Sequence, residues 1–341
     1  MIHCGLQCLD CYYPIHLDTY SGCSHACKYC FANEKNTIKN IKPLSNAKAL
    51  KAFIKGERNL ETKWCDWDIP IHWGANSDPF QICEKEYKKS LECLEIFKET
   101  KYPFIVSTKN PVLLTEEPYL STISECECVL QISMSCPKYD KLEPGAPTFE
   151  KRLEAAKILS GKVNRIIARI QPCFPDCTSD IIQALSGYKE AGIYGVIVSG
   201  YFTKKKTKGM QREGTRYRFP LDILYRTFKQ IKDECHKVGL KFLCGEGGLD
   251  WMGDSLICCG TDGLDDFKPN LFTLSNIAYD PENSNPTEKQ KEIGTTRPFR
   301  SIRQSLAWEL HIKDKSYADM LYEYYSYVEW LRDMRDKYGS D

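Results

Sequence analysis

The chain has 341 residues, of which 42% are hydrophobic and 27% charged, a balance typical of folded globular proteins. Its formal net charge of +1 gives no information about an anionic or cationic partner, which only local charge can indicate. Its 18 cysteines fit either a disulfide framework or metal ligation. The N-terminal sequence lacks the pattern of a secretory signal, and no apolar run reaches the roughly 20 residues that cross a bilayer. We therefore expect a cytoplasmic protein without membrane contact. In that compartment its cysteines are expected to be free or metal-bound.

Short β-branched and aromatic runs alternate with helical patterns between residues 15 and 245. This alternation predicts an α/β fold with a parallel sheet, either doubly wound or curled into a full or partial barrel. The expected strands are 15–20, 69–73, 104–108, 129–133, 165–170, 196–201 and 241–243. The expected helices lie near 45–56, 84–99, 149–160, 179–190 and 220–238.

Three regions follow from this pattern: a Cys-rich segment 1–14, a catalytic α/β region 15–245, and a C-terminal region 246–341. The last begins with a Gly- and Cys-rich loop, continues through a polar, proline-containing linker near 276–300 and ends in helical periodicity. The apolar stripe of that final helix is expected to pack in the core; its members are Tyr317, Leu321, Tyr324, Val328 and Leu331.

Three cysteines follow the first predicted strand at C-x3-C-x2-C spacing: Cys23, Cys27 and Cys30. Thiolates suit iron–sulfur clusters, and three ligands leave one iron of a cubane open to a small molecule. A structural zinc site is the alternative, but it needs four ligands, and His25 is the one further candidate inside the loop.

This loop resembles the signature of the radical S-adenosylmethionine (SAM) superfamily, and the chain is similar more narrowly to the spore photoproduct lyase-like branch. The matching stretches are 20–25 (YSGCSH), 76–79 (NSDP), 107–110 (STKN), 133–135 (SMS) and 143–147 (EPGAP), followed by Glu150, Arg152, Ala155 and Ala156. The resemblance implies a partial (β/α)6 barrel of TIM type with Cys-rich extensions, whose active site lies at the carboxyl ends of the strands. It also implies a [4Fe-4S] cluster on the three cysteines, SAM as cofactor, and an external electron donor of flavodoxin or ferredoxin type.

The resemblance further implies SAM-binding residues at the strand ends. The candidates are Tyr29, Ser77, Asp78, Lys109, Ser133, Ser135 and Arg169. Lys109 and Arg169 are expected to pair with the SAM carboxylate, and the hydroxyls with its amino group or ribose; a structural role is the alternative for each. One departure matters: Ala75 stands where spore photoproduct lyase carries a hydrogen-donating cysteine, so the final radical step must differ.

Two further cysteine groups are candidates for an auxiliary [4Fe-4S] cluster or zinc. Cys4, Cys8 and Cys11 repeat the C-x3-C-x2-C spacing, with unligated surface cysteines as the alternative. Cys244, Cys258 and Cys259 would supply a missing ligand if the two ends of the barrel meet in space. Adjacent cysteines seldom bind one metal together, so one of the last two is expected to be spare.

A basic stretch at 204–218 follows the sixth predicted strand, with Lys204, Lys205, Lys206, Arg212 and Arg216 as candidate substrate contacts. Such a loop favours binding of a nucleic-acid backbone, and a base inside a duplex would have to be extruded to reach a radical. A solvated loop without a ligand is the alternative.

The sequence thus predicts a radical SAM lyase or isomerase acting on a nucleic-acid base, for example a modified thymine. The competing hypotheses are radical modification of a peptide or protein, and a non-catalytic zinc protein that binds nucleic acid.

Overall fold

The computed structural model describes residues 2–4, 11–34, 40–59, 61–290 and 317–339. Cys8 and the end of the predicted linker lie outside these residues. An eight-stranded sheet forms the centre of the molecule, in the order β1-β2-β3-β4-β5-β6-β7-β10. The strands are β1 (His3–Cys4), β2 (Ile15–Leu17), β3 (Ile71–Trp73), β4 (Phe104–Thr108), β5 (Cys128–Ser133), β6 (Arg165–Ile170), β7 (Gly195–Val198) and β10 (Lys241–Cys244).

The sheet confirms the predicted fold class. β1 pairs with β2 in antiparallel direction, and each neighbouring pair from β2 to β10 is parallel. Every residue of β4 and β5 is buried, as expected of parallel strands covered on both faces. The open strand order is consistent with a partial barrel, in which β10 adds a seventh parallel strand to the six that the resemblance implied.

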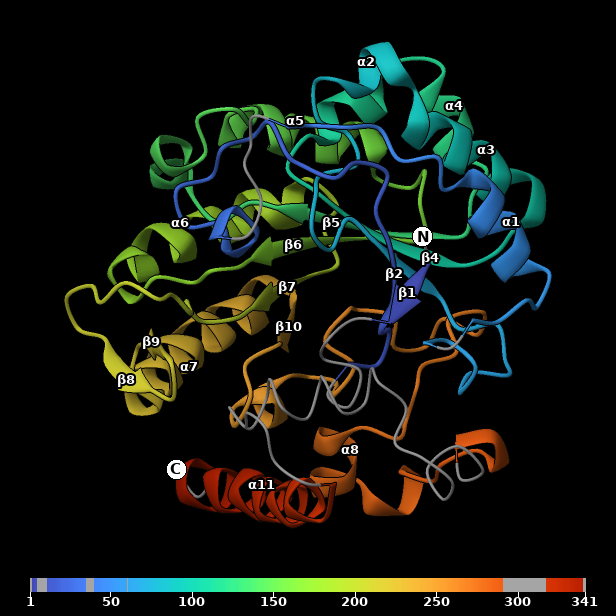
Figure 1. Cartoon of the computed structure of the whole chain (residues 1–341). Coiled ribbons are helices and arrows are strands. Elements are labelled where there is room, and N and C mark those ends of the chain that lie inside the picture. Colours follow the sequence, from blue (N-terminus) through green and yellow to red (C-terminus); the bar gives the residue numbers. More distant parts are fainter. Residues whose placement is uncertain (1, 5–10, 35–39, 60, 291–316, 340–341) are drawn as a thin grey trace.

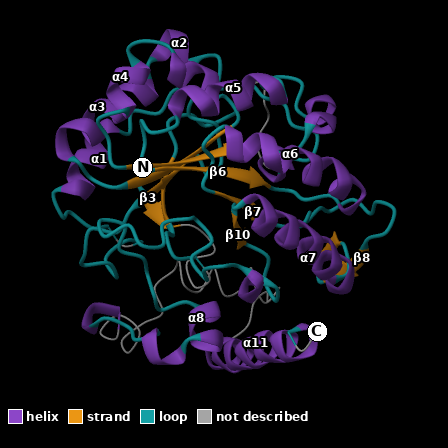
Figure 2. Ribbon diagram, turned by 180° about the vertical axis from the view of Figure 1, so that it is seen from behind, coloured by secondary structure: helices purple, strands orange, loops and turns teal. Residues whose placement is uncertain are grey.

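Helices cover the outer face of the curved sheet, whereas the segment after β10 runs back beneath it toward β1 (Figures 1 and 2). The α-helices are α1 (Ala47–Ile54), α2 (Glu84–Tyr87), α3 (Lys89–Thr100), α4 (Tyr119–Ile123), α5 (Phe149–Leu159), α6 (Thr178–Glu190), α7 (Leu221–Val238), α8 (Leu274–Tyr279) and α11 (Tyr317–Tyr338). Short 3-10 helices occupy Phe31–Glu34, Pro111–Thr115, Pro137–Leu142, Pro175–Cys177, Asp250–Met252 and Pro281–Asn283.

The prediction of one continuous helix over 84–99 was wrong, because the chain breaks between α2 and α3. Lys88 adopts the left-handed conformation with φ of 51°. The buried carboxylate of Glu84 then accepts hydrogen bonds from the backbone N–H groups of Ser90 (2.9 Å) and Leu91 (2.8 Å), which satisfies the start of α3. The Glu84 side chain thus replaces the hydrogen bonds that a continuous helix would make, and the hydrophobic periodicity of the sequence does not reveal this replacement.

The final helix packs as its stripe predicted, as far as its side chains are described. Val328 and Leu331 are buried, and the hydroxyl of Tyr279 in α8 donates to the carbonyl of Leu331 (3.0 Å). Within the described ranges, no helix is both long and apolar enough to cross a membrane.

The basic stretch contains a feature that the sequence did not reveal, a hairpin of β8 (Gln211–Glu213) and β9 (Arg216–Arg218). The guanidinium of Arg218 is buried and donates to Glu246 (2.5 Å), just after β10. Glu246 also accepts hydrogen bonds from the backbone N–H of Gly200 and, at 3.4 Å, from the hydroxyl of Ser199. These contacts hold the hairpin at the carboxyl ends of β7 and β10.

Candidate active site

The cysteine loop starts directly after β2, at the carboxyl edge of the parallel strands. None of Cys23, Cys27 and Cys30 takes part in a disulfide; Cys27 is buried, and the other two are partly exposed. The backbone N–H of Cys30 donates to the carbonyl of Cys27 (3.1 Å), which gives the end of the loop a tight turn. Three thiols therefore share one loop at the edge where parallel sheets bind ligands.

His25 links this loop to the end of β3. Its Nε2 lies 3.1 Å from the Asp78 carboxylate, and both side chains are almost fully buried. Asp78 also accepts hydrogen bonds from the hydroxyl of Thr108 (2.8 Å) and the backbone N–H groups of Phe80 (2.9 Å) and Lys109 (2.6 Å). Burial alone would raise the pKa of Asp78, but the charge and hydrogen bond of His25, with the other donors, hold that pKa below its ordinary value. Asp78 therefore contacts protein groups with both carboxylate oxygens.

The stretch 143–147 packs on the same loop, and Gly145 makes the approach possible. The backbone N–H of Gly145 donates to the carbonyl of His25 (3.0 Å), and His25 Nδ1 lies 2.9 Å from the Gly145 carbonyl. A Cβ at position 145 would lie 2.8 Å from the Cα of His25 and closer still to the carbonyl oxygen of Ser24. Glycine is therefore required here for close approach of two backbones.

Glu143 and Arg152 form a buried ion pair behind the loop (2.5 Å). Glu143 also accepts a hydrogen bond from the hydroxyl of Tyr29, the residue before Cys30. Arg152 donates to the carbonyls of Pro147 (2.7 Å) and Ser133 (2.7 Å), and so joins the loop to the end of β5. The EPGAP segment and Arg152 thus act together as a support for the cysteine loop.

Two further polar side chains hold the entry to the loop. Gln81 accepts from the backbone N–H of Ser24 (2.8 Å) and donates to the carbonyl of Gly22 (2.8 Å). The hydroxyl of Ser77 donates to the carbonyl of Tyr20 (2.6 Å). Neither Gln81, His25 nor Gly145 stood among the predicted SAM-binding or cluster residues, and their partners lie too far away in the sequence for a local pattern to reveal them.

Lys109 places a positive charge beside the loop. Its Nζ lies 5.6 Å from the centre of the Tyr29 ring and 3.9 Å from Glu143 Oε1. Burial raises the pKa of Cys23 to about 11 and that of Cys27 to about 12, while the charge of Lys109 acts in the opposite direction on both thiols. Lys109 therefore favours the thiolate forms that a metal requires.

Arg169 belongs to a polar row that crosses the inner face of the sheet. Its guanidinium donates to Ser107 (2.9 Å), Gln131 (2.9 Å) and Gln171 (2.8 Å). The row continues to His72, whose Nε2 lies 3.0 Å from the Ser107 hydroxyl. Edge-to-face ring contacts then join His72 to His16 and His16 to His3. The row therefore crosses the sheet from β6 to β1. Burial lowers the pKa of His16 to about 3 and that of His72 well below its ordinary value, so both rings are neutral near pH 7.

The other predicted site residues lie as follows. Ser133 ends β5, and Ser133 and Ser135 are both buried near the carboxyl edge. Lys204, Lys205, Lys206 and Arg212 are exposed, and Arg216 is buried in β9. Cys4 and Cys244 are buried in β1 and β10. Cys258 and Cys259 lie next to each other in the turn beneath the sheet, and Cys11 is close enough to act electrostatically on Cys259. Cys8 lies outside the described residues.

The donor set of the first loop fits an iron–sulfur cluster. In the described part of the chain, no three His, Cys, Asp or Glu side chains meet as a single metal ion would require. A cluster takes each thiolate on a different iron and so needs its ligands spread around a larger body. Three thiols on one loop, with no disulfide among them and a cation beside them, satisfy that requirement.

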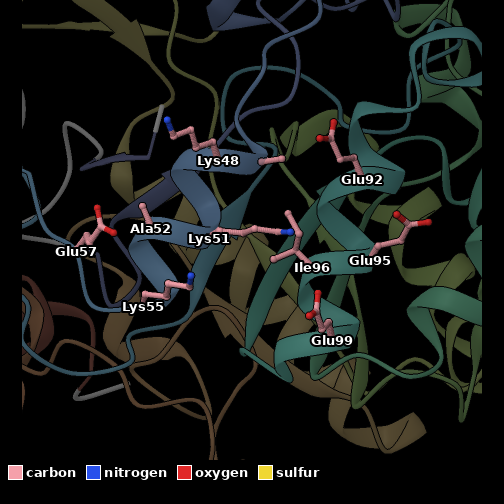
Figure 3. Close-up of a pocket in the computed structure, with 10 residues that line it drawn as sticks. Lys48, Lys51, Ala52, Lys55, Glu57, Glu92, Glu95, Ile96 and Glu99 are labelled. Carbon is pink, nitrogen blue, oxygen red and sulfur yellow. The ribbon is translucent and has the colours of Figure 1, made fainter.

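An open groove of about 580 Å³ lies away from these strand ends, between α1 and α3 (Figure 3). Figure 3 shows Lys51 of α1 extending toward α3, which carries Glu92, Glu95 and Glu99. The charged lining of the groove comprises Lys48, Lys51, Lys55, Glu57, Glu92, Glu95 and Glu99. It belongs to the outer helical layer and includes no residue of the candidate site.

Comparison with known proteins gives distant relatives. No family model matches the sequence. The chain is 24% identical over 201 residues to an uncharacterized protein of Mycobacterium tuberculosis, which covers 56% of this chain and 59% of that relative. It is 25% identical over 164 residues to an uncharacterized protein of Methanocaldococcus jannaschii, with 47% and 60% covered. The chain thus spans about 60% of the length of these curated relatives.

Solved structures with a similar arrangement include SuiB of Streptococcus suis bound to S-adenosylmethionine, with a TM-score of 0.46 at 14% identity over 69% of this chain and 51% of that chain. They also include anSMEcpe with bound AdoMet and the Kp18Cys peptide (TM-score 0.47, 14% identity, 96% and 99% covered). Methylornithine synthase (PylB) has a TM-score of 0.43 at 15% identity, with 82% and 84% covered. At these values the ligands of those proteins carry no argument about this chain.

Proposed function

We propose that this protein is a radical SAM enzyme of the spore photoproduct lyase-like branch, with a [4Fe-4S] cluster on Cys23, Cys27 and Cys30. When bound, the cluster would supply the electron that cleaves SAM to methionine and a 5′-deoxyadenosyl radical, which takes a hydrogen atom from the substrate. An external donor of flavodoxin or ferredoxin type would replace the electron. The observation that carries the proposal is a loop of three cysteines, none of them in a disulfide, at the carboxyl edge of a parallel sheet.

The chain's own contribution is to hold this loop rigidly. His25 and Asp78 fix it to β3, and Gly145 presses the EPGAP segment against it. Glu143 orients Tyr29 beside the last cysteine. Preorganisation of this kind keeps the cluster and its substrate at a constant distance without reorganisation during the reaction.

The SAM contact is assigned to groups that border the loop. Lys109 is the cation beside the cysteines, so we assign the SAM carboxylate to it. Ser133 and Ser135, at the end of β5, are proposed for the amino group or ribose. Asp78 already accepts several protein donors, and its proposed role is to position the loop.

A nucleic-acid base is the proposed substrate. Support comes from the exposed cations at 204–206 and from Arg212, which the Arg218–Glu246 pair anchors near the carboxyl ends of β7 and β10. Beside β8, an open groove of about 560 Å³ contains three aromatic side chains, Tyr327, Trp330 and Tyr338. Exposed cations near aromatic rings suit a single strand with unstacked bases. The overall conversion would be a lyase or isomerase reaction.

The test of the radical chemistry is anaerobic reconstitution with iron and sulfide, followed by dithionite, SAM and an assay for 5′-deoxyadenosine. The wild type should form deoxyadenosine, and a Cys23/Cys27/Cys30→Ala variant should form none and hold about four fewer irons per chain. Cys93→Ala, which removes a buried core thiol on α3, is the matched control and should keep both properties. Zinc in place of iron, or deoxyadenosine from the triple variant, would contradict the proposal.

The substrate class is tested separately, by fluorescence anisotropy with a single-stranded oligonucleotide, a duplex of the same sequence and an unrelated basic peptide. Tighter binding of the single strand, weakened by Trp330→Ala, supports the nucleic-acid assignment. Equal or tighter binding of the peptide would overturn it and favour protein modification.

A further inference from the structure

Two segments far apart in the sequence meet beneath the sheet, near the start of β2. The hydroxyl of Tyr13 lies 2.6 Å from the hydroxyl of Thr261 and donates to the carbonyl of Phe267 (2.9 Å). The backbone N–H of Asn270 donates to the carbonyl of Tyr12 (2.8 Å). Residues 11–13 and 258–270 are thus one packed unit, and each contributes cysteines to it.

The turn that presents Cys258 and Cys259 is built against the inner face of β6. Gly260 has φ of +74°, and a Cβ there would lie 2.5 Å from the side chain of Ile167. Its carbonyl accepts a hydrogen bond from Arg165 (3.0 Å). Only glycine allows the turn to press this closely on the strand, so the two thiols are held in a fixed place.

Arg169 faces the same thiols from β6. Gln131 accepts from Arg169 (2.9 Å) and donates to the carbonyl of Cys259 (3.4 Å), so it ties the guanidinium to the turn. Cys11, Cys258 and Cys259 each act electrostatically on Arg169, against the effect of burial, which lowers its pKa. Among the residues that the structure describes, Arg169 has no carboxylate within ion-pair distance. Arg169 is partly buried, and a cation in such a place without a carboxylate partner favours an anion beside it.

Asp250 is a second polar group of the same region. It is buried, and the Ser275 and Tyr279 hydroxyls lie beside its carboxylate, while its Oδ1 has no hydrogen-bond partner. Its charge acts on both Cys244 and Cys258, which places it in the neighbourhood of the thiol group. An unsatisfied buried carboxylate oxygen near thiols is a further potential metal ligand.

We infer that Cys11, Cys258 and Cys259 bind a second iron–sulfur cluster, whose negative charge Arg169 offsets. In such a cluster the two adjacent cysteines would take different irons, so neither would be spare, contrary to the expectation from sequence. Thiolates are the ligands that such clusters use, and a cluster bound by thiolates is anionic. Asp250 is the candidate for a fourth ligand. This centre would join the N-terminal segment to the segment after β10. The inference is independent of SAM cleavage, because a structural cluster can be present whether or not the first loop performs radical chemistry.

The experiment removes the first cluster and asks what remains. The Cys23/Cys27/Cys30→Ala protein is reconstituted anaerobically, and its iron, sulfide and electron paramagnetic resonance spectrum after reduction are measured. About four irons per chain and a cluster signal should remain. Adding Cys258→Ala and Cys259→Ala together should abolish both, and adding Cys11→Ala should lower the iron content at least several-fold.

Two controls separate loss of ligands from loss of folding. Adding Cys235→Ala instead removes a buried thiol on α7 and should leave the residual iron unchanged. Circular dichroism of each variant reports the fold directly. The inference is overturned if the triple variant holds no iron, if it holds zinc, or if the folded Cys258/Cys259 variant keeps the residual cluster. Failure of the first cluster instead appears as absence of deoxyadenosine from a wild type that still holds about four irons.

Discussion

Gly145→Ala should destabilise the protein and weaken its hold on the cluster. The added methyl group would lie 2.8 Å from the Cα of His25, with no flexible side chain to yield. Forcing a methyl group into a packed contact costs about 1–3 kcal/mol. The two hydrogen bonds between Gly145 and His25 are each worth about 1 kcal/mol, and a shift of the loop would weaken both. We therefore expect a loss of about 2–4 kcal/mol in the free energy of unfolding.

The assay is urea unfolding of the apo protein, followed by iron per chain and deoxyadenosine formation after reconstitution. Gly187→Ala is the matched control, because its Cβ would meet only Leu153 at an ordinary 3.5 Å. Gly187 lies inside α6, so alanine there should stabilise the protein by about 0.5–1 kcal/mol. If Gly145→Ala kept wild-type stability and iron content, the argument that the EPGAP segment supports the cysteine loop would fail.

Three further outcomes are expected. Asp78→Asn should cost about 1–3 kcal/mol and speed iron loss to a chelator, since the amide removes the negative partner of the loop histidine; unchanged iron retention would contradict this. The pKa of His16 is about 3 in the folded protein and about 6.5 in the unfolded chain, so protons bind the unfolded chain more tightly. The free energy of unfolding therefore decreases as pH falls from 6.5 toward 3, and at pH 5 it should be about 2 kcal/mol lower than at pH 7. Urea unfolding at pH 7 and 5 should show this loss, reduced in His16→Gln; equal losses in both proteins would refute it. Alanine at 204–206 should lower the salt slope of single-strand binding by about 2, whereas alanine at Lys48, Lys51 and Lys55 beside the other groove should leave it unchanged.

Local patterns in the sequence predicted much of the fold. All seven expected parallel strands are present, because their apolar runs are continuous and turn residues bound them. The strands that were missed are β1, with two residues, and β8 and β9, with three each; such short edge strands carry too few residues for a period. The break between α2 and α3 was missed because a buried glutamate, not a helix-breaking residue, ends the helix.

The candidate site likewise contains residues that the sequence could predict and contacts that it could not. The three cysteines of the first loop could be predicted because their spacing is local. The contacts of His25 with Asp78 and Gly145 could not, because they join segments that no periodicity connects. Charge counting was also incomplete: Arg218 belongs to the basic stretch by sequence, yet its guanidinium is buried against Glu246.

The contact between residues 11–13 and 258–270 has a consequence for biosynthesis. Closing a loop of this length costs about 5 kcal/mol in chain entropy, so the contact forms late, after the strands between have paired. At about 5–20 residues per second, synthesis leaves the inner face of the sheet uncovered for several seconds before residue 270 emerges. The order of events is therefore built into the chain: the polar row of the inner face is exposed first, and the segment after β10 then closes over it.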